Sequence, residues 1–244
     1  MTQRHDQLST EEFHKKELLH AIYGIYADWV SRFPLVCQKG CAACCTQSVT
    51  MTSLEGEIIL DGIRELEREK WLFEKLAQTT PGESRSLMTT NQFAEACLKQ
   101  LEVDNETLCD WDLSPCIFLE DAGCSIYELR PFGCRSFGSL VRCRPEGSAE
   151  ITPIHLTVNT VFSQIIEHLS SGSGHWSSMT DILHSLADKE PTLFEKHLLP
   201  ARPVPGLLLE PQEVQEVQSL LKRLCKHSSA AEGLGDLIDN LMLI

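Results

Sequence analysis

Residues 37–45 read CQKGCAACC, so four cysteines lie within nine residues. A second cysteine-rich stretch, residues 107–145, comes after helix-like sequence and shows no helical periodicity of its own. A stretch without helical periodicity that contains several Pro and Gly residues is typical of irregular backbone rich in turns. The fold is therefore expected to depend on how two distant, irregular segments bring their thiols together.

The composition is that of a globular protein with a hydrophobic core. Apolar residues make up 42% of the 244 residues and charged residues 23%, which disfavours disorder and coiled coil. The formal charge of −14 would repel a phosphate backbone, so we expect no nucleic-acid partner. Residues 1–16 hold no apolar signal region, and no apolar run approaches the roughly 20 residues of a membrane span. We therefore expect a cytoplasmic protein with no membrane contact.

The eleven cysteines favour metal binding over disulfides, because thiols stay reduced in the cytoplasm. Their odd number also excludes complete internal pairing. Export by a route that leaves no trace in the sequence would instead permit a disulfide framework. Thiol–disulfide exchange through Cys44 and Cys45, or through the C-x-x-C pair, is a further alternative, but the sequence shows no thioredoxin-like β-α-β context around them.

Hydrophobic periodicity predicts helices before, between and after the cysteine-rich segments. Ser9 and Glu12 form a capping box for a long first helix that ends before Pro34. A second helix starts near Thr52 or Ser53, with the carboxylate of Glu55 placed to reach back. Further helices are expected over residues 70–78, after a cap at Asn91, and over residues 158–169, 179–189 and 211–226.

The fold class expected from this pattern is mainly α, with helices packed around an irregular cysteine-rich metal-binding core and few or no short strands. The short strand candidates are residues 116–119 and 139–143. We expect a cysteine-cluster domain over residues 1–145 and a helical region over residues 146–244 that packs on it. Cys97 and Cys225 lie within helical patterns and are expected to be small buried apolar residues.

Metal ligation is the chemistry that the cysteine spacing indicates. Cys41 and Cys44 have the C-x-x-C spacing that aims two sulfurs at one point, and Cys37 can join from the preceding turn. Cys44 and Cys45 are adjacent, so both cannot bind one tetrahedral ion without strain. They would serve two metals, a multi-iron cluster, or one ligand and one neighbouring thiol.

The second segment would deliver each of its cysteines from a separate turn. Cys116, Cys124 and Cys134 are spaced too widely for a local knuckle, and Pro and Gly residues nearby provide turns. Four arginines and no carboxylate lie between residues 130 and 145: Arg130, Arg135, Arg142 and Arg144. This positive block is expected to lower thiol pKa values and neutralise a cluster; the alternative is a solvated basic face.

Taken together, the two segments resemble the YkgJ-like cysteine-cluster proteins, which are described as a zinc- or iron-chelating domain. The resemblance lies in a C-x-x-C-C cluster followed by P-C-x-F-L, G-x-C-x-I-Y-E-x-R-P and C-R, and it spans residues 37–135. The matching positions are Cys41, Cys44, Cys45, Pro115, Cys116, Phe118, Leu119, Gly123, Cys124, Ile126, Tyr127, Glu128, Arg130, Pro131, Cys134 and Arg135.

The resemblance implies a set of metal ligands: Cys41, Cys44, Cys45, Cys116, Cys124 and Cys134, with Cys37 as a seventh. The gap between Cys37 and Cys41 is one residue longer than is usual in the family, and Gly40 can absorb that residue in a turn. Cys109 and Cys143 flank the second block and are reserve ligands. Tyr127, Arg130 and Arg135 would donate hydrogen bonds to thiolate or sulfide sulfur; otherwise Tyr127 is a core aromatic and Arg130 pairs with Glu128 or a helix end.

The cofactor expected is an iron–sulfur cluster or zinc, since all-thiolate sites suit both. One zinc needs four ligands and a cubane cluster takes four thiolates; the excess of cysteines and the arginines favour the cluster. The function expected is metal binding with a structural or redox role and an unidentified protein partner. The alternative is a cluster-dependent enzyme that modifies a protein or a small molecule, distantly similar to the flagellin lysine methylases. His155, His168 and His184 lie in helical patterns and are expected to be structural.

Overall fold

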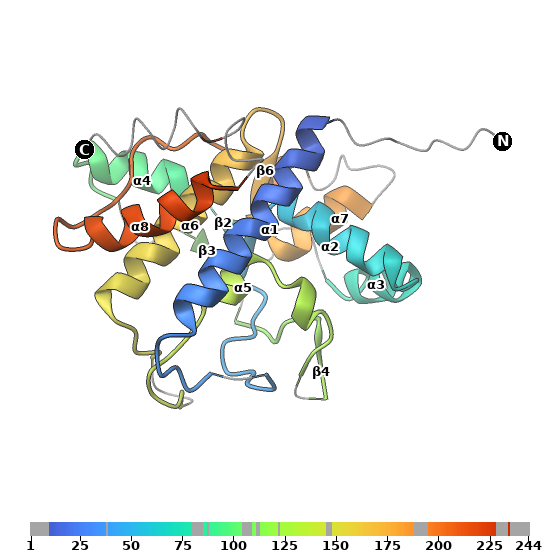
Figure 1. Cartoon of the computed structure of the whole chain (residues 1–244). Helices are drawn as coiled ribbons and strands as arrows, with labels where there is room; N and C mark the ends of the chain where they lie inside the picture. Colours follow the sequence, from blue (N-terminus) through green and yellow to red (C-terminus); the bar gives the residue numbers. More distant parts are fainter. Residues whose placement is uncertain are drawn as a thin grey trace. The chain divides into compact units, whose positions relative to one another are not determined.

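The computed structural model describes residues 10–37, 39–79, 85–86, 88–103, 109–110, 113–121, 123–144, 148–187, 195–227 and 234. Over these ranges the chain is mainly helical, as expected (Figure 1). None of the helices in the described ranges is long and apolar enough to cross a membrane. The expected capping residue Ser9 lies outside the described residues.

The chain divides into two compact units, one of residues 1–32 with 211–244 and one of residues 33–210. The expected boundary at 145/146 coincides with neither limit. Elements on both sides of residue 145 pack together within the second unit: helix α6 contacts α2 and α4, and strand β6 pairs with β1. Residues 146–210 therefore complete the unit that contains both cysteine-rich segments.

The first unit contains α1 (Thr10–Val30) and α8 (Val214–Cys225), which lie side by side in Figure 1. The indole N–H of Trp29 donates to Glu216 Oε1 at 2.7 Å, and Arg223 Nη2 lies 2.6 Å from Asp28 Oδ2. The apolar face of α8 comprises Val217, Leu220, Leu221 and Leu224. Cys225 falls one position past that face and is exposed, so the expectation that it is buried was wrong.

The second unit contains six helices and seven short strands among the described residues. The helices are α2 (Ser53–Glu65), α3 (Glu69–Leu76), α4 (Thr90–Leu98), α5 (Phe132–Ser136), α6 (Pro153–Ser170) and α7 (Met179–Ala187), with 3-10 turns η2 (Tyr127–Leu129) and η4 (Glu195–His197). The strands are β1 (Thr50–Thr52), β2 (Arg85–Ser86), β3 (Cys109–Asp110), β4 (Leu119–Glu120), β5 (Gly123–Cys124), β6 (His175–Ser178) and β7 (Leu199–Pro200).

These strands are more numerous than the expected few or none. They form an antiparallel sheet in the order β1-β6-β7 and two separate pairs, β2-β3 and β4-β5. Of the two strand candidates, residues 116–119 contribute only the start of β4, and residues 139–143 form no strand.

The three-stranded sheet sets the positions of α2 and α7, because each helix begins where a strand ends. Met51 pairs with Ser177 in the middle of the β1-β6 register. Thr52 then caps α2 in a capping box with Glu55, as the sequence predicted. The two helices pack against one another, and their apolar faces meet beside the sheet.

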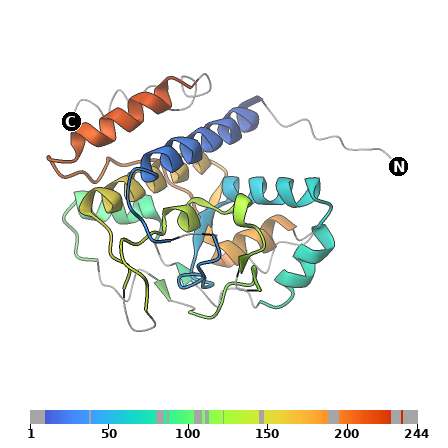
Figure 2. The ribbon, with the colours of Figure 1, turned by 60° about the horizontal axis from the view of Figure 1, so that its bottom comes forward.

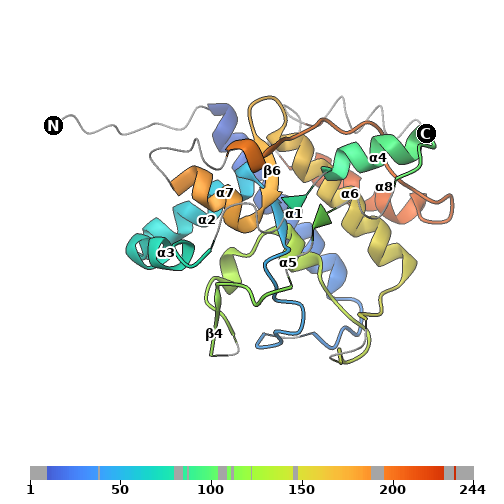
Figure 3. The ribbon, with the colours of Figure 1, turned by 180° about the vertical axis from the view of Figure 1, so that it is seen from behind.

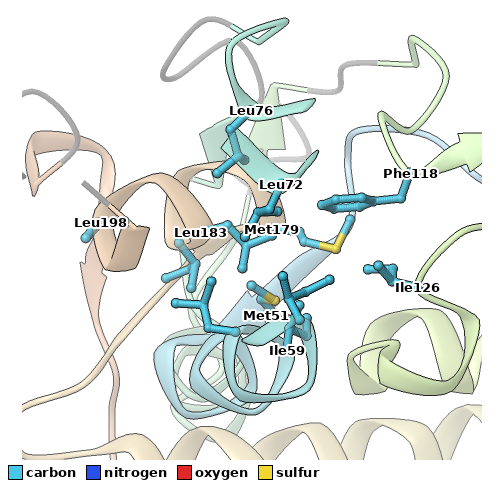
Figure 4. Close-up of a cluster of buried hydrophobic side chains, with 12 residues drawn as sticks. Met51, Ile59, Leu72, Leu76, Phe118, Ile126, Met179, Leu183 and Leu198 are labelled. Carbon is cyan, nitrogen blue, oxygen red and sulfur yellow. The ribbon is translucent and has the colours of Figure 1, made fainter. Parts of the chain in front are cut away.

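A hydrophobic cluster lies between α2, α3, α7 and the second cysteine-rich segment (Figure 4). Met51, Leu72 and Leu183 occupy its middle, and Phe118 and Ile126 enter it from the cysteine-rich side. Cys116 and Cys124 pack against this cluster. The second cysteine-rich segment is therefore anchored on the core, although its backbone is mostly irregular.

Helix α4 is capped by Thr89, whose side chain accepts from Gln92 N, and not by Asn91 as expected. Asn91 is buried in the first turn, where its amide donates to the carbonyls of Gln164 and Arg202 at 2.9 and 2.8 Å. These bonds fix the first turn of the helix, and the side chain of Leu98 in its last turn is exposed. Cys97 is exposed there, so the expectation that it is buried was wrong.

Candidate metal centre

The first cysteine-rich segment is a series of tight turns. Gly40, in the turn between Cys37 and Cys41, has φ +95°, a left-handed conformation that glycine adopts without strain. Cys45 N then donates to Ala42 O at 3.1 Å. Cys41 and Cys44 are exposed on these turns, whereas Cys37 and Cys45 are half-buried.

A short antiparallel contact joins the first cysteine-rich segment to the second. Cys116 N donates to Cys45 O at 3.0 Å, and Gln47 N donates to Ser114 O at 3.0 Å. An isolated bridge between Thr46 and Pro115 lies between these two bonds. Because paired backbones hold facing residues at a fixed spacing, Cys45 and Cys116 become neighbours although residues 46–115 separate them in sequence.

Cys124 lies on the hairpin formed by β4 and β5, and Cys116 lies in the turn that leads into β4. Leu119 pairs with Cys124 in this hairpin, and Leu119 N donates to Cys116 O at 3.0 Å. The Cys116 thiol also receives a hydrogen bond from the backbone of Phe118. Both thiols therefore occupy positions that backbone hydrogen bonds define.

Side chains of helix α3 contact Glu120 in this hairpin. The indole N–H of Trp71 donates to Glu120 Oε1 at 3.1 Å, and Lys75 Nζ lies 2.7 Å from the same oxygen. The guanidinium of Arg68 lies 3.8 Å from the Trp71 ring centre and donates to Ser125 O at 3.2 Å. These contacts fix the hairpin on both sides of Cys124.

Cys134 lies on the short helix α5, which is placed by a residue of α2. Glu55 Oε1 accepts a hydrogen bond of 2.7 Å from Phe132 N, in the first turn of α5. Gly133 faces β1 closely: a Cβ there would lie 3.0 Å from Thr50 O. The sequence identified Glu55 as a capping residue of its own helix, but no local pattern showed that it also positions Cys134.

Four cysteines affect one another electrostatically, and we call them the inner group: Cys45, Cys116, Cys124 and Cys134. Each of the other three raises the pKa of Cys45 electrostatically, and Cys116 and Cys124 do the same to Cys134. Burial is the largest cause of the raised pKa values of Cys116 and Cys134. In the absence of metal these two thiols are protonated at neutral pH.

The expectation that the arginine block lowers thiol pKa values was wrong for most of the shifted cysteines. Burial also raises the pKa of Cys37. Cys44 and Cys45 share a hydrogen bond, which raises the pKa of Cys44 and lowers that of Cys45. Arg130 acts in the expected direction on Cys44 and Cys134, but burial and neighbouring thiols outweigh it.

Arg130 stacks on Tyr127, and Arg135 bonds to the backbone beside them. The Arg130 guanidinium lies 3.5 Å from the Tyr127 ring centre, and its Nε donates to Tyr127 O at 2.8 Å. Arg135 donates to the carbonyls of Arg130 and Glu128 at 2.7 and 2.6 Å. These hydrogen bonds organise the backbone that leads into α5, and Arg130 also places a positive charge near Cys44 and Cys134.

The residues before Cys37 contact Ser139, in the segment that leads to Cys143. Val36 N donates to Ser139 O at 2.9 Å, and the Cys37 thiol also has a hydrogen bond to the backbone of Ser139. Cys143 is half-buried, although Val141, Arg142 and Arg144 around it are exposed. Cys109 pairs with Ser86 in the β2-β3 ladder, and its side chain lies outside the described part of the structure.

The three helix-borne histidines make structural contacts, as the sequence indicated. His155 shares a hydrogen bond of 2.8 Å with Thr152, and His184 shares one of 2.8 Å with Thr79. His168 Nδ1 accepts from Val204 N at 3.4 Å.

Among the residues that the structure describes, no three His, Cys, Asp or Glu side chains form a group that could hold a metal ion as they stand. The donor chemistry of the inner group nevertheless fits a thiophilic metal, because it consists of four thiols delivered by ordered backbone. Metal binding would require these thiols to reorient toward a common point.

No family model matches the chain, and neither a curated protein nor a solved structure matches it. The resemblance to the YkgJ-like proteins, and with it the ligand set, stays a prediction.

Proposed function

We propose that this protein binds a thiophilic metal centre, an iron–sulfur cluster or zinc, with the inner group as its principal ligands. The observation that supports the proposal most is the antiparallel contact between residues 45–47 and 114–116. It places the backbone of Cys45 beside that of Cys116, and Cys124 and Cys134 lie near enough to act electrostatically on the Cys45 thiol. Backbone that is ordered around four thiols is what a four-thiolate site requires.

Each ligand position is supported by contacts outside the thiols themselves. Glu55 orients α5 and therefore Cys134, and Trp71 and Arg68 hold the hairpin that bears Cys124. Such supporting contacts determine how well ligands are directed at a metal. Arg130 would offset part of the negative charge that bound thiolates bring, because its charge already opposes the burial that raises the pKa of Cys134.

The two candidate centres imply different roles. Zinc has no redox chemistry, so a zinc ion in the inner group would link the two cysteine-rich segments and stabilise the fold. An iron–sulfur cluster would link them in the same way and would also accept and release an electron. Both roles use the same four side chains.

Anaerobic purification of the whole chain tests the proposal. Iron with equimolar acid-labile sulfide and a brown colour would support the cluster, and a colourless protein with stoichiometric zinc would support the zinc form. The variant Cys116→Ser should lose the metal, whereas Cys97→Ser, which changes an exposed cysteine on α4, should keep it. A chain that holds neither metal after anaerobic purification and reconstitution contradicts the proposal.

The enzyme hypothesis has its own test. If the chain holds an iron–sulfur cluster, the electron paramagnetic resonance spectrum of the reduced cluster is recorded with and without S-adenosylmethionine. A changed spectrum would favour an enzyme, and an unchanged spectrum would favour a binding or electron-transfer module.

A further inference from the structure

Four large apolar side chains are exposed on the segments around α5. Each has more than a third of its surface exposed: Val36, Phe137, Val141 and Leu156. Exposed apolar side chains that are scattered singly need no explanation, whereas neighbouring ones mark an interaction site. Whether these four are neighbours therefore decides what they indicate.

One backbone hydrogen bond brings Val36 beside two of the others. Val36 N donates to Ser139 O at 2.9 Å. Phe137 and Val141 lie two residues before and two residues after Ser139. These three exposed side chains are therefore neighbours on the surface, although about a hundred residues of sequence separate Val36 from the other two.

Leu156 reaches the same region from α6. Asn159 lies one turn after Leu156 on this helix. Its amide donates to Ser136 O at 3.1 Å, directly before Phe137. Figures 1 and 2 show the loop after α5 beside both the start of α6 and the loop of residues 33–48 (blue), and the view from behind in Figure 3 agrees. We call these four side chains the apolar patch: Val36, Phe137, Val141 and Leu156.

Ser139 fixes the backbone beneath the apolar patch. Its side chain is fully buried, and its hydroxyl donates to Val141 O at 2.7 Å and accepts from Glu150 N at 3.1 Å. Leu140 N donates to Glu150 O at 2.8 Å, so the backbone is held from both sides. A surface that is already ordered loses less conformational entropy when a partner binds. The apolar patch is therefore preorganised for binding.

Two exposed arginines follow the apolar patch in the sequence. Within the described ranges, neither Arg142 nor Arg144 has an ion pair or a hydrogen bond. Glu150 is exposed nearby, but no ion pair joins its carboxylate to either arginine in that part of the chain. Glu146 lies outside the described residues. The structure thus presents two guanidinium groups beside exposed apolar side chains.

An exposed aromatic side chain beside unpaired arginines is a combination typical of protein–protein interfaces. Aromatic residues and arginine are enriched there, and complementary charge selects and orients the partner. The partner that fits is a segment with both apolar and carboxylate side chains. The formal charge of −14 means that most of the surface repels such a segment, so the two arginines would direct it to the apolar patch.

We infer that the apolar patch, together with Arg142 and Arg144, is a docking surface for an acidic segment of a partner protein. Phe137 and its apolar neighbours contact aliphatic or aromatic side chains of the segment, and the two guanidinium groups pair with its carboxylates. The inference goes beyond the proposed function, because none of these residues is a proposed metal ligand. Its test is therefore separate from any measurement of metal content.

Fluorescence anisotropy with two labelled peptides tests the docking surface. The probe is a peptide of six Glu-Leu repeats, and the matched peptide has lysine in place of every glutamate. Each peptide is titrated with the wild-type chain, Phe137→Ser, Arg142→Glu and Arg144→Glu. The control variants Phe73→Ser and Lys70→Glu change an exposed phenylalanine and an exposed lysine on α3. Circular dichroism confirms that every variant is folded.

The wild-type chain is expected to bind the acidic peptide and not the basic one, and to bind it more weakly at raised salt. Phe137→Ser, Arg142→Glu and Arg144→Glu should each weaken binding by about tenfold or more, and both α3 variants should match the wild type. No binding of the acidic peptide, equal binding of the two peptides, or equal losses in the α3 variants would overturn the inference.

Two further measurements detect other occupants of the same surface. A concentration-dependent dimer in sedimentation velocity that is lost in Phe137→Ser would mean that a second copy of the chain covers the apolar patch. Flotation with phosphatidylglycerol vesicles that is lost in Arg142→Glu would mean that the surface meets a lipid headgroup. Either result overturns the acidic segment as the occupant, and a monomer that leaves the vesicles unbound supports it.

Discussion

Glu55 on α2 and Phe132 on α5 are joined by a hydrogen bond of 2.7 Å from the backbone N–H of Phe132 to Glu55 Oε1. The other carboxylate oxygen, Oε2, accepts from Thr52 N at 2.9 Å in the capping box of α2. One buried side chain therefore satisfies backbone donors at the starts of two helices. The second of these helices bears Cys134, so the helix cap also determines the position of a candidate ligand.

Glu55→Ala should lower the free energy of unfolding by about 2–4 kcal/mol, because it removes a cap and leaves a buried backbone N–H without an acceptor. Urea unfolding followed by circular dichroism measures the loss. Glu65→Ala, which changes an exposed glutamate at the end of the same helix, should shift the free energy by less than about 0.5 kcal/mol. Equal losses in the two variants would contradict the role assigned to Glu55.

Gly133→Ala should weaken metal retention and lower the free energy of unfolding by about 1–3 kcal/mol, because the added Cβ meets backbone that cannot yield easily. It would lie 3.0 Å from Thr50 O and 3.3 Å from Val49 Cγ1. The matched control is Gly24→Ala in α1, where nothing lies within 4 Å of the added Cβ. That substitution should stabilise the chain by up to about 1 kcal/mol, since alanine favours helix. Thermal unfolding and metal content of both variants test the contrast.

Arg68→Ala should loosen the hairpin that bears Cys124 and cost about 1–2 kcal/mol, because it removes the stacking on Trp71 and the hydrogen bond to Ser125 O. The measurement is the rate at which a chelator removes metal from the folded chain, which should rise. Arg64→Ala serves as the control, because the ion pairs that the structure describes for Arg64 are with partly exposed Asp61 and Glu69 and contribute little. A chelation rate that is equally raised in both variants would count against the hairpin contacts.

Metal affinity should rise with pH across the neutral range. Burial raises the pKa values of Cys116 and Cys134, so both thiols carry protons before metal binds. For each thiol that loses a proton on binding, the apparent metal affinity rises by up to tenfold for each unit rise in pH. This holds as long as that thiol is protonated in the metal-free chain. Zinc competition titrations at pH 6.5, 7.0 and 7.5, with calorimetry in buffers of different ionisation enthalpy, measure the proton count. An affinity independent of pH would mean that the ligands are already thiolates.

Local signals in the sequence predicted the helices well, because each depends on neighbouring residues. The Thr52–Glu55 capping box is such a signal, and it fixed the start of α2 correctly. Asn91 is equally suited to cap a helix, but its amide instead bonds to Gln164 and Arg202. These hydrogen-bond partners lie far from Asn91 in the sequence, so no pattern of neighbouring residues could show them.

For the candidate site, the sequence suggested which cysteines to consider. It did not show how the backbone brings the two cysteine-rich segments into contact. Spacing and resemblance predicted a set of cysteine ligands, which stays a prediction, but they did not show the two long-range backbone contacts of the cysteine-rich segments. One joins Cys45 to Cys116 and the other joins Val36 to Ser139. Backbone pairing between irregular segments leaves no hydrophobic periodicity, so the sequence showed neither contact.

The contact between Cys45 and Cys116 also has a consequence for the order of folding. The chain between them includes α2, α3 and α4. Because closing so long a loop is entropically costly, the local helices are expected to form before this contact. During synthesis CQKGCAACC emerges before any of its distant partners, so a thiophilic ion captured early would find the first segment alone. If the inner group holds a metal as proposed, an ion captured early would have to exchange ligands as the second segment arrives, and the site would be complete only after the chain has folded.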